Sequence, residues 1–468
     1  MLAAGAAAAE PPDFSKPEPG EAEPGGAATS HAPRNTSAFS QFSANMHFSR
    51  QINFKVGDGI FRKLWVSAPA STKSSDGLGP LYNSRSCQSC HLKDGRGRPP
   101  APGEAAVSMF LRLSVPARND EERALLASLR AAVIPEPTYG TQLQNFSVQG
   151  VLAEGRMEIA YEELPVTLAD GGIVRLRKPR YRAAELNYGP MAPGAMLSPR
   201  VAPPMIGMGL LEAIPDADIL ARADPEDRNG DGISGRPNRV WSEIDGKVML
   251  GRFGWKAGEA SVAAQSAHAF AGDMGLSSAL APDAWGDCSA AQADCRRAPD
   301  GRDAKEGVEV TRQMLDLVVF YARNLAVPAR PNAAAPEVLA GKRIFHAAGC
   351  AACHNPSFTT RADSAELEQS AQKIWPYTDL LLHDMGEGLA DNRPESAADG
   401  REWRTAPLWG LGLTEIVSGH TQLLHDGRAR NPLEAILWHG GEAEAAKQRV
   451  IAMPKKEREA LLAFLRSL

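Results

Sequence analysis

Two five-residue stretches, residues 87–91 and 350–354, constrain this chain more than any other feature of its sequence. Both read Cys-x-x-Cys-His, so two thiols three residues apart are followed directly by an imidazole. This spacing is typical of c-type haem attachment, because the thiols can add to the two vinyl groups of one haem and the histidine then lies under the iron. The chain is therefore predicted to carry two covalently bound haems, one held by Cys87, Cys90 and His91 and one by Cys350, Cys353 and His354.

Zinc is the alternative cofactor for these cysteines, since two Cys-x-x-Cys pairs can supply four thiolates to a tetrahedral site. A zinc site does not require a histidine directly after each pair, and the two pairs lie near opposite ends of the chain. Both observations favour haem.

The chain has 468 residues, which is enough for about three domains and more than one sizeable core. Its hydrophobic fraction of 43% and charged fraction of 23% are ordinary for a globular protein. Because the net charge is −5 and no basic run occurs, nucleic acid is not expected as a partner. No apolar run approaches the roughly 18 residues of a transmembrane helix, so no membrane span is expected.

Cys288 and Cys295 are the two cysteines outside the haem motifs. An even pair around a short polar loop favours a disulfide and an oxidising compartment, and two free thiols are the alternative. Thioether-linked haem is also assembled outside the bacterial cytoplasm, so the protein is expected in the periplasm. Residues 1–9 lack the basic start and apolar length of a signal peptide and fit the remnant of a processed signal or a misplaced start.

Composition and prolines divide the chain into three parts. Residues 1–37, rich in Pro, Gly and Ala, are expected to form a disordered tether or signal remnant. Residues 38–330 are expected to form an N-terminal haem domain and residues 331–468 a C-terminal one, with Pro328 and Pro331 at the boundary. Helical periodicity over residues 305–325, 338–348 and 457–468 predicts a mainly α fold with two cytochrome c-like haem domains.

A β-containing insertion is predicted at about residues 105–190 of the N-terminal domain. Residues 109–115 and 156–160 alternate like strands. Residues 166–168 and 173–176 flank Asp170-Gly171-Gly172, a sequence typical of a hairpin turn, and residues 121–133 favour a helix.

Beyond the haem motifs, five phrases carry a resemblance to a known family. They are Arg252-Phe253-Gly254-Trp255-Lys256-Ala257, Gly272-Asp273-Met274-Gly275, Trp403-Arg404-Thr405-Ala406-Pro407-Leu408-Trp409-Gly410-Leu411, Leu424-His425-Asp426-Gly427-Arg428-Ala429 and Ile436-Leu437-Trp438-His439-Gly440-Gly441-Glu442. With them the chain resembles the bacterial di-haem cytochrome c peroxidase and MauG superfamily. It most resembles the branch called di-haem oxidoreductases or thiol oxidoreductases, to which the rubber oxygenases are more distantly similar. The matching phrases span nearly everything after about residue 50.

The resemblance implies roles for four residues. In the family's peroxidases a Trp-Asp-Gly-Arg-Ala phrase, a Gln and a Glu-Met-Gly follow one another near the reactive haem, and Trp255, Gln265 and Asp273 fall in that order here. The resemblance therefore implies that Trp255 lies between the haems and that Asp273, with its shorter side chain, replaces the distal glutamate. His439 occupies the place of the distal methionine of the electron-transfer haem.

The number of protein ligands on each iron decides what each haem can do, because a single ligand leaves a position open for peroxide or oxygen. His439 follows a helical stretch and is the preferred second ligand of the C-terminal haem, with His383, His425, Met385 and Met453 as alternatives. Over the first haem no ligand is nominated, since Met274 fits packing better than ligation. There Asp273 could move the proton that peroxide cleavage needs, and a helix cap or surface charge is its alternative role.

A possible calcium loop begins at Asp227, where Asp227, Asn229 and Asp231 repeat the start of an EF-hand loop. The twelfth position is Asn238 rather than the bidentate glutamate. A tight turn rich in Asx residues is the equal alternative to calcium binding.

The leading hypothesis is a peroxidase in which the N-terminal haem reduces hydrogen peroxide. The C-terminal haem would store or relay electrons from a small periplasmic donor or oxidisable substrate through Trp255. A ferryl state shared between the two irons is expected if both ligands of the second haem are strong donors. The alternatives are an oxygenase related to the rubber-cleaving enzymes and an electron-transfer cytochrome without catalysis. Asp273 favours the peroxidase, because an ionisable distal group assists peroxide cleavage more than stable oxygen binding.

Overall fold

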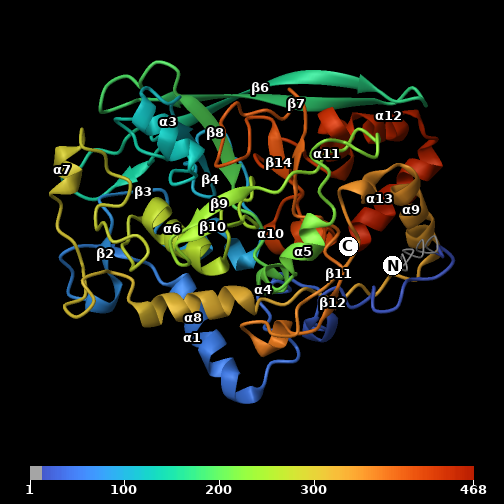
Figure 1. Cartoon of the computed structure of the whole chain (residues 1–468), viewed down its shortest axis with the longest axis horizontal. Coiled ribbons are helices and arrows are strands. Elements are labelled where there is room, and N and C mark those ends of the chain that lie inside the picture. The colour runs from blue at the N-terminus through green and yellow to red at the C-terminus, as the bar shows by residue number, and fades with distance from the viewer. Residues whose placement is uncertain (1–12) are drawn as a thin grey trace, which may run out of the picture.

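The computed structural model describes residues 13–468, so the expectations for residues 1–12 lie outside the described residues (Figure 1). The helices are α1 (Gln51–Arg62), α2 (Cys87–Cys90), α3 (Asp120–Ala127), α4 (Met208–Glu212), α5 (Asp216–Leu220), α6 (Val262–Met274), α7 (Ala293–Arg296), α8 (Arg312–Arg323), α9 (Pro336–Ala347), α10 (Thr414–Ser418), α11 (Pro432–Trp438), α12 (Glu444–Ala452) and α13 (Lys455–Ser467). None of the helices in residues 13–468 has the length and apolar character that crossing a bilayer requires.

The strands pair two by two into small sheets. They are β1 (Val66–Ser67), β2 (Asp76–Leu78), β3 (Leu81–Tyr82), β4 (Met109–Ser114), β5 (Phe146–Ser147), β6 (Arg156–Thr167), β7 (Ile173–Ala184), β8 (Met196–Val201), β9 (Arg239–Ser242), β10 (Lys247–Leu250), β11 (Phe358–Thr359), β12 (Lys373–Ile374), β13 (Leu382–Asp384) and β14 (Glu402–Arg404).

The prediction of a mainly α protein made of two cytochrome c-like domains is wrong. Helices take up 29% of the chain and strands 18%. The helical periodicity does mark real helices, since α8, α9 and α13 fall within or next to the predicted segments. The segments between them form loops and hairpins instead, because β-strand pairs and backbone hydrogen bonds in turns satisfy their polar groups there.

The predicted hairpin is confirmed and is longer than the sequence pattern indicates. Strands β6 and β7 pair in register over their full lengths, from Arg156 opposite Ala184 to Thr167 opposite Ile173. Figure 1 shows this ribbon running along one edge of the molecule until it lies over α11 and α12. At its tip the amide of Ala169 donates to the carbonyl of Ile451 (3.0 Å), so the insertion fastens onto the C-terminal part of the chain.

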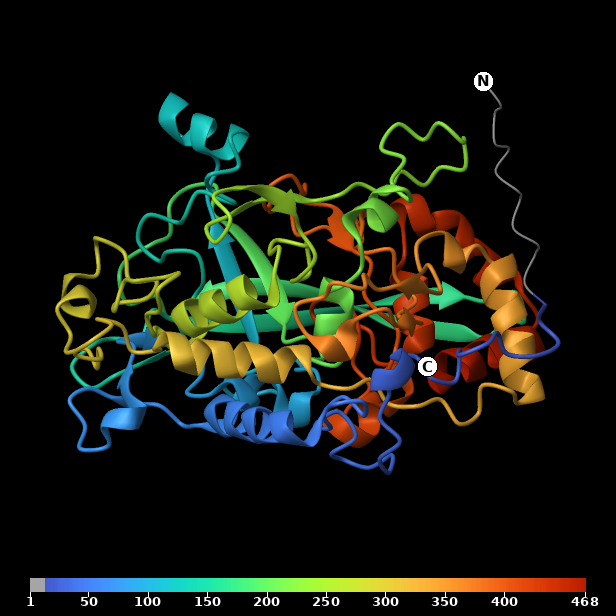
Figure 2. The same cartoon turned by 60° about the horizontal axis from the view of Figure 1, so that its bottom comes forward.

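Two helical packings position the haem motifs. Helices α1 and α8 run side by side, with α6 next to α8 (Figure 2). Gly57 allows this close approach, because a Cβ at that position would lie 2.3 Å from the carbonyl oxygen of Leu317. In the C-terminal part, α9 packs against α13 immediately before the second motif.

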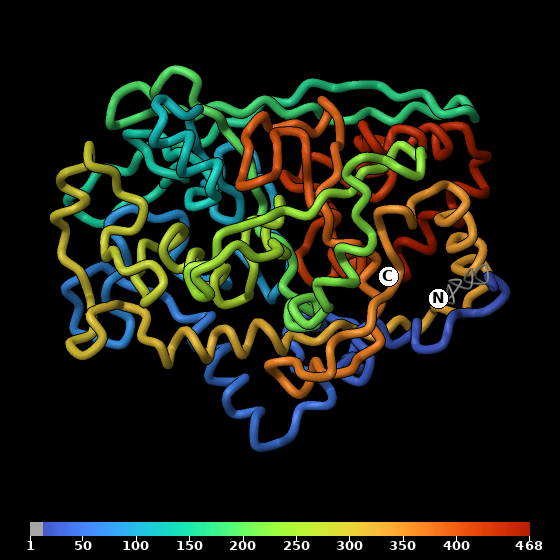
Figure 3. The backbone as a smooth tube through the Cα atoms, viewed as in Figure 1, coloured from blue at the N-terminus to red at the C-terminus, as the bar shows by residue number. Residues whose placement is uncertain are grey.

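Residues 13–37, for which the composition predicts a tether, pack against the C-terminal part of the chain: the amides of Arg330 and Trp375 donate to the carbonyls of Ala22 (2.9 Å) and Pro24 (2.8 Å). Figure 3 shows the N-terminal segment running along the C-terminal helices before it reaches α1. The reason is a buried carboxylate: Glu21 is 2% exposed and pairs with Lys342 Nζ (2.7 Å) and Arg330 Nη1 (3.0 Å). It also accepts a hydrogen bond from the hydroxyl of Tyr377 (2.7 Å). Composition alone could not predict this specific charge pairing.

Glu21→Gln is expected to destabilise the protein by about 3–5 kcal/mol, because it leaves two buried cations without their anion. Although burial opposes ionisation, Lys342 and Arg330 hold the pKa of Glu21 at about 2, below its usual 4.5. The stabilisation by Glu21 is therefore complete above pH 4.5 and is lost as the pH falls towards 2. Denaturant unfolding at pH 7 measures the difference. The exposed Glu337→Gln should cost less than about 1 kcal/mol, and an equal cost in both variants would contradict the role of Glu21.

Candidate haem sites

A cavity of about 410 Å³, which we call the second cavity, lies beside the second Cys-x-x-Cys-His motif. Its walls include Cys350, Cys353 and His354 together with His439 and Trp255, and most of the remaining lining is apolar. Its volume is within the usual range for cofactor sites. Because the two thiols and two imidazoles open onto the same cavity, these residues fit a haem.

Both motifs fold into the same tight turn. The amide of His354 donates to the carbonyl of Cys350 (2.9 Å), and the amide of His91 donates to the carbonyl of Cys87 (3.0 Å). One helical turn brings two side chains three residues apart to the same face, so each pair of thiols can reach one ligand. In the first motif, Ser86 caps the turn by accepting the amide hydrogen of Ser89 (3.2 Å).

His354 and His439 are both prepared to bind iron through Nε2. The Nδ1 atom of His354 donates to the carbonyl of Tyr377 (3.0 Å), and Nδ1 of His439 donates to the carbonyl of Ala435 (2.7 Å). Such bonds orient the ring and fix the tautomer that leaves Nε2 available, as at many metal-bound histidines. Burial lowers the pKa of His354 to about 4, with a smaller contribution from nearby His439, so its lone pair is free at neutral pH.

The alternative ligands differ in how available they are. His383 has both ring nitrogens engaged, Nε2 with Asp379 (2.9 Å) and Nδ1 with Glu442 (2.7 Å). His425 lines the cavity, stacks on Trp403 with ring centroids 3.7 Å apart, and its buried Nε2 has no hydrogen-bond partner among residues 13–468. Of the two methionines named as alternatives, Met385 lines the cavity, whereas Met453 is buried in the C-terminal core.

The first motif has one oriented imidazole. Nδ1 of His91 donates to the carbonyl of Pro203 (2.8 Å), which leaves Nε2 available. Burial lowers the pKa of His91 to about 4. Met274 is buried in the apolar core with Phe270 and Leu276, as its packing interpretation predicts.

Asp273 lies close to the first motif, near the C-terminal end of α6. Its charge is one cause of the raised pKa of both Cys87 and Cys90, after burial. The helix end can approach the motif because Gly79 and Gly275 cross: a Cβ on Gly79 would lie 2.4 Å from the Cα of Gly275. Asp273 is half-buried and lies within α6, whose caps are Ser261 and Gly275.

Two residues that the sequence patterns did not reveal surround this carboxylate. Gln142 donates from Nε2 to Oδ1 of Asp273 (2.9 Å). Burial raises the pKa of Asp273 above its usual 3.8, while the guanidinium of Arg112 and the bond from Gln142 oppose this. Arg112 lies on β4, whose strand pattern was recognised, but no sequence motif marks either residue as part of a site.

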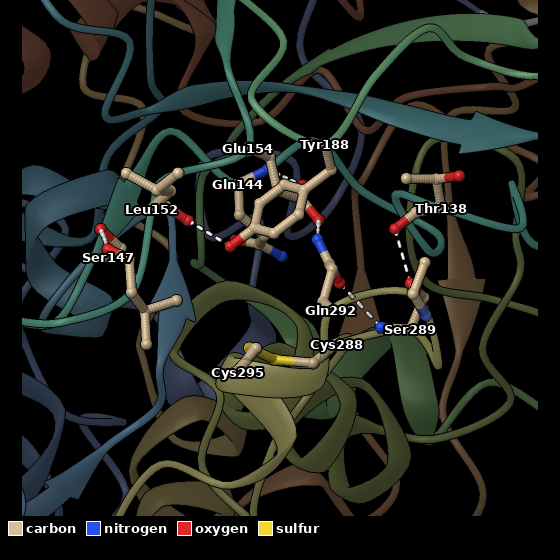
Figure 4. The surroundings of a disulfide bond; sticks show 12 residues. Thr138, Gln144, Ser147, Leu152, Glu154, Tyr188, Cys288, Ser289, Gln292 and Cys295 are labelled. Carbon is tan, nitrogen blue, oxygen red and sulfur yellow. Dashed lines mark hydrogen bonds between the residues drawn. A yellow bond between two sulfur atoms is a disulfide. The ribbon is translucent and has the colours of Figure 1, made fainter.

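A loop closed by a disulfide lies behind these groups, and Figure 4 shows the surroundings of that bond. The predicted bond between Cys288 and Cys295 is confirmed. Within this loop Gln292 donates to Glu154 (2.6 Å), which in turn accepts from the amide of Gln144 (2.6 Å). Just before Cys288, the carboxylate of Asp287 accepts from the amide of Gln142 (2.9 Å). The loop thus fixes the backbone that carries the Gln142 side chain to Asp273.

Trp255 lies on the wall of the second cavity and is linked to the first motif. Its indole Nε1 donates to the carbonyl of Val201 (2.8 Å), two residues before the carbonyl that accepts from His91. Gln265 lies on α6, two turns before Asp273, and its Oε1 would be 3.6 Å from a Cβ on Gly254. Eight residues of helix correspond to about 12 Å, so Gln265 does not share the surroundings of Asp273.

A family model described as "Di-haem oxidoreductase, putative peroxidase" matches residues 20–468. The chain belongs to this di-haem oxidoreductase family. The match confirms the resemblance, and a di-haem family implies haem cofactors.

Other comparisons add little to the family assignment. No curated protein matches this di-haem oxidoreductase. A solved structure of hydrazine synthase from Kuenenia stuttgartiensis, pressurised with xenon, has 18% identity and a TM-score of 0.22. The similarity covers 34% of this chain and 55% of that one, so the chain spans about half the length of this protein.

The family's two haem motifs do not combine into a zinc site here. Among residues 13–468, no three His, Cys, Asp or Glu side chains gather as metal ligands. The loop at residues 227–232 is an Asx turn, in which the amides of Gly232 (3.1 Å) and Asp231 (2.9 Å) donate to the side chains of Asp227 and Asn229. Calcium binding by Asp227, Asn229 and Asp231 stays a prediction.

Proposed function

We propose that this di-haem oxidoreductase is a periplasmic peroxidase that reduces hydrogen peroxide at the haem of the first motif. The supporting observation is the asymmetry between the two sites. The second cavity has two imidazoles, His354 and His439, each with Nδ1 bonded to a carbonyl. The first motif has His91 and, near its cysteines, the carboxylate of Asp273. One site is thus suited to electron transfer and the other to substrate.

Covalent attachment through Cys87 and Cys90, and through Cys350 and Cys353, belongs to this proposal. When bound, each haem would supply a redox-active iron; His354 and His439 would hold the second haem, and His91 would hold the first, where peroxide would react. The reaction consumes two electrons and two protons: H₂O₂ + 2 H⁺ + 2 e⁻ → 2 H₂O. The electrons come from a small periplasmic donor or an oxidisable substrate.

Asp273 is the proposed proton-transfer group. Its carboxylate accepts a proton from one oxygen of hydrogen peroxide and returns it to the other, which leaves as water. Gln142 holds the carboxylate in position through its bond to Oδ1. The positive charge of Arg112 favours the ionised form, which has to accept that proton.

The electron route is proposed to pass through Trp255. Its hydrogen bond to Val201 and the bond from His91 to Pro203 connect the indole to the first proximal histidine through one short backbone segment. On the other side, the same indole borders the cavity that contains His354. A direct connection of this kind supports the second haem as the electron store.

The peroxidase proposal is tested by mixing ascorbate-reduced protein with hydrogen peroxide in a stopped-flow instrument. One peroxide should be consumed for every two electrons released. Stable oxygen binding by the reduced protein without peroxide consumption would indicate an oxygenase. If neither peroxide nor oxygen reacts, the protein transfers electrons only.

Trp255→Phe should slow electron exchange between the haems after peroxide is added by at least about tenfold, while both resting spectra stay unchanged. The phenyl ring is harder to oxidise and loses the hydrogen bond to Val201. Trp241→Phe is the matched control. Trp241 lies on strand β9, its indole packs against the guanidinium of Arg130, and it does not line the cavity. Equal kinetics in wild type and Trp255→Phe would show that the electron bypasses this side chain.

A further inference from the structure

Arg96 and Arg404 line the second cavity, and neither forms a salt bridge with Asp231 or Glu442, the two acids of its lining. Arg96 donates from Nη2 to the carbonyl of Leu424 (2.5 Å), and its buried Nε has no hydrogen-bond partner among residues 13–468. Arg404 donates to the carbonyls of Gly254 (2.9 Å) and Thr405 (3.0 Å). Within the described part of the chain, neither guanidinium has a carboxylate within salt-bridge distance, which is 4.0 Å.

The nearest acids are already engaged. Asp426 is the acid whose charge acts on Arg96, but its carboxylate is taken by Arg428 Nε (2.8 Å) and the hydroxyl of Tyr181 (2.8 Å). Asp379, which acts on Arg404, pairs with His383. The two arginines therefore lack an anion that the protein itself could supply.

The two arginines bracket Trp255. The guanidinium carbon of Arg96 lies 5.5 Å from the centre of the Trp255 ring. The amide of Arg404 donates to the carbonyl of Trp255 (2.9 Å). One cation thus comes from the loop that follows the first haem motif and the other from β14, and both are placed at the cavity wall that Trp255 forms.

Such charges require an anionic ligand. Burial lowers the pKa of both guanidiniums to about 10, yet both remain protonated at neutral pH. A buried charge without a partner is costly, and guanidinium is well suited to carboxylates because its donors match their geometry. A haem carries two propionate carboxylates, one for each arginine.

We propose that Arg96 and Arg404 bind the propionate carboxylates of the haem attached to the second motif, with the carboxylate edge turned towards Trp255. The inference rests on the second haem of the proposed function. It adds that the loop following His91 contributes a propionate-binding side chain, Arg96, to the other haem. Binding in the second cavity thereby joins the two motifs through Arg96.

The test is a redox titration of the low-spin haem in wild type, Arg96→Gln and Arg404→Gln between pH 5 and 9. A nearby cation favours the reduced haem, so each variant should lower the reduction potential. We expect at least about a tenfold change in the equilibrium constant, which is ~59 mV for a one-electron couple. The released carboxylate should also take up a proton at higher pH than in wild type. The pH range in which the reduction potential changes should therefore move to higher pH.

Arg449→Gln is the matched control, because Arg449 also lines the cavity but is exposed, so that solvent screens its charge. Its shift should be less than half as large. If the Arg96 and Arg404 variants keep two haems and an unchanged potential, the proposal is overturned. Where a Gln variant loses the second haem, the Lys variant at that position should restore it, and failure to do so would show that the arginine is only structural. Because no peroxide is used, these outcomes are independent of the peroxidase activity.

Discussion

Asp273→Asn is expected to lower the rate of peroxide consumption by roughly two to four orders of magnitude, or about 3–5 kcal/mol of barrier. The amide keeps the size of the side chain and an oxygen that can accept from Gln142, but it cannot take up and return a proton. Steady-state peroxide consumption measures the loss. The haem content and resting spectrum should stay intact, because Asp273 is not proposed as a ligand.

The pH profile gives a second readout for Asp273. Burial raises the pKa of its carboxyl, with Arg112 and Gln142 acting in the opposite direction, and the ionised form has to accept the proton. Activity should therefore fall as the pH drops through a value above 3.8, and this acid limb should disappear in Asp273→Asn. Asp283→Asn, an exposed control in the following loop, should leave rate and profile unchanged. A loss of less than about threefold in Asp273→Asn would exclude the proton-transfer role.

His439→Ala is expected to convert the haem of the second motif from low spin to high spin. The substitution removes one of the two imidazoles proposed as iron ligands, and His383 cannot replace it while both of its ring nitrogens are bonded to carboxylates. Paramagnetic-resonance and optical spectra of the resting protein measure the change. The exposed His47→Ala should keep the wild-type spectrum. If His439→Ala also keeps that spectrum, another side chain, with His425 the first to examine, is the ligand.

The sequence predicted the parts of the molecule that depend on short local patterns. The haem motifs, the hairpin turn at residues 170–172 and the helices α8, α9 and α13 are all specified by spacing or periodicity within a few residues. The disulfide followed from the count of the remaining cysteines. The order of family phrases implies that Asp273 replaces the distal glutamate of the first haem, and this role stays a prediction.

The parts that could not be predicted depend on contacts between residues far apart in the sequence. Glu21 pairs with Lys342 more than 300 positions away, so a segment with a disordered composition becomes buried. Gln142 donates a hydrogen bond to Asp273 on α6, which is 131 positions away, and no sequence pattern indicates that the two residues are in contact. The two-domain cytochrome prediction failed for a related reason: periodicity identified the helices but gave no information on the small sheets that form between them.

The central claim is that one haem is open to peroxide and the other carries two histidine ligands. It is tested most directly by paramagnetic-resonance spectra of the resting protein, with haem content established by mass spectrometry of denatured protein. The account predicts two covalently bound haems per chain, one high-spin and one low-spin signal, and loss of the high-spin signal when one equivalent of peroxide is added. Two low-spin signals that peroxide leaves unchanged, or a single bound haem, would contradict it.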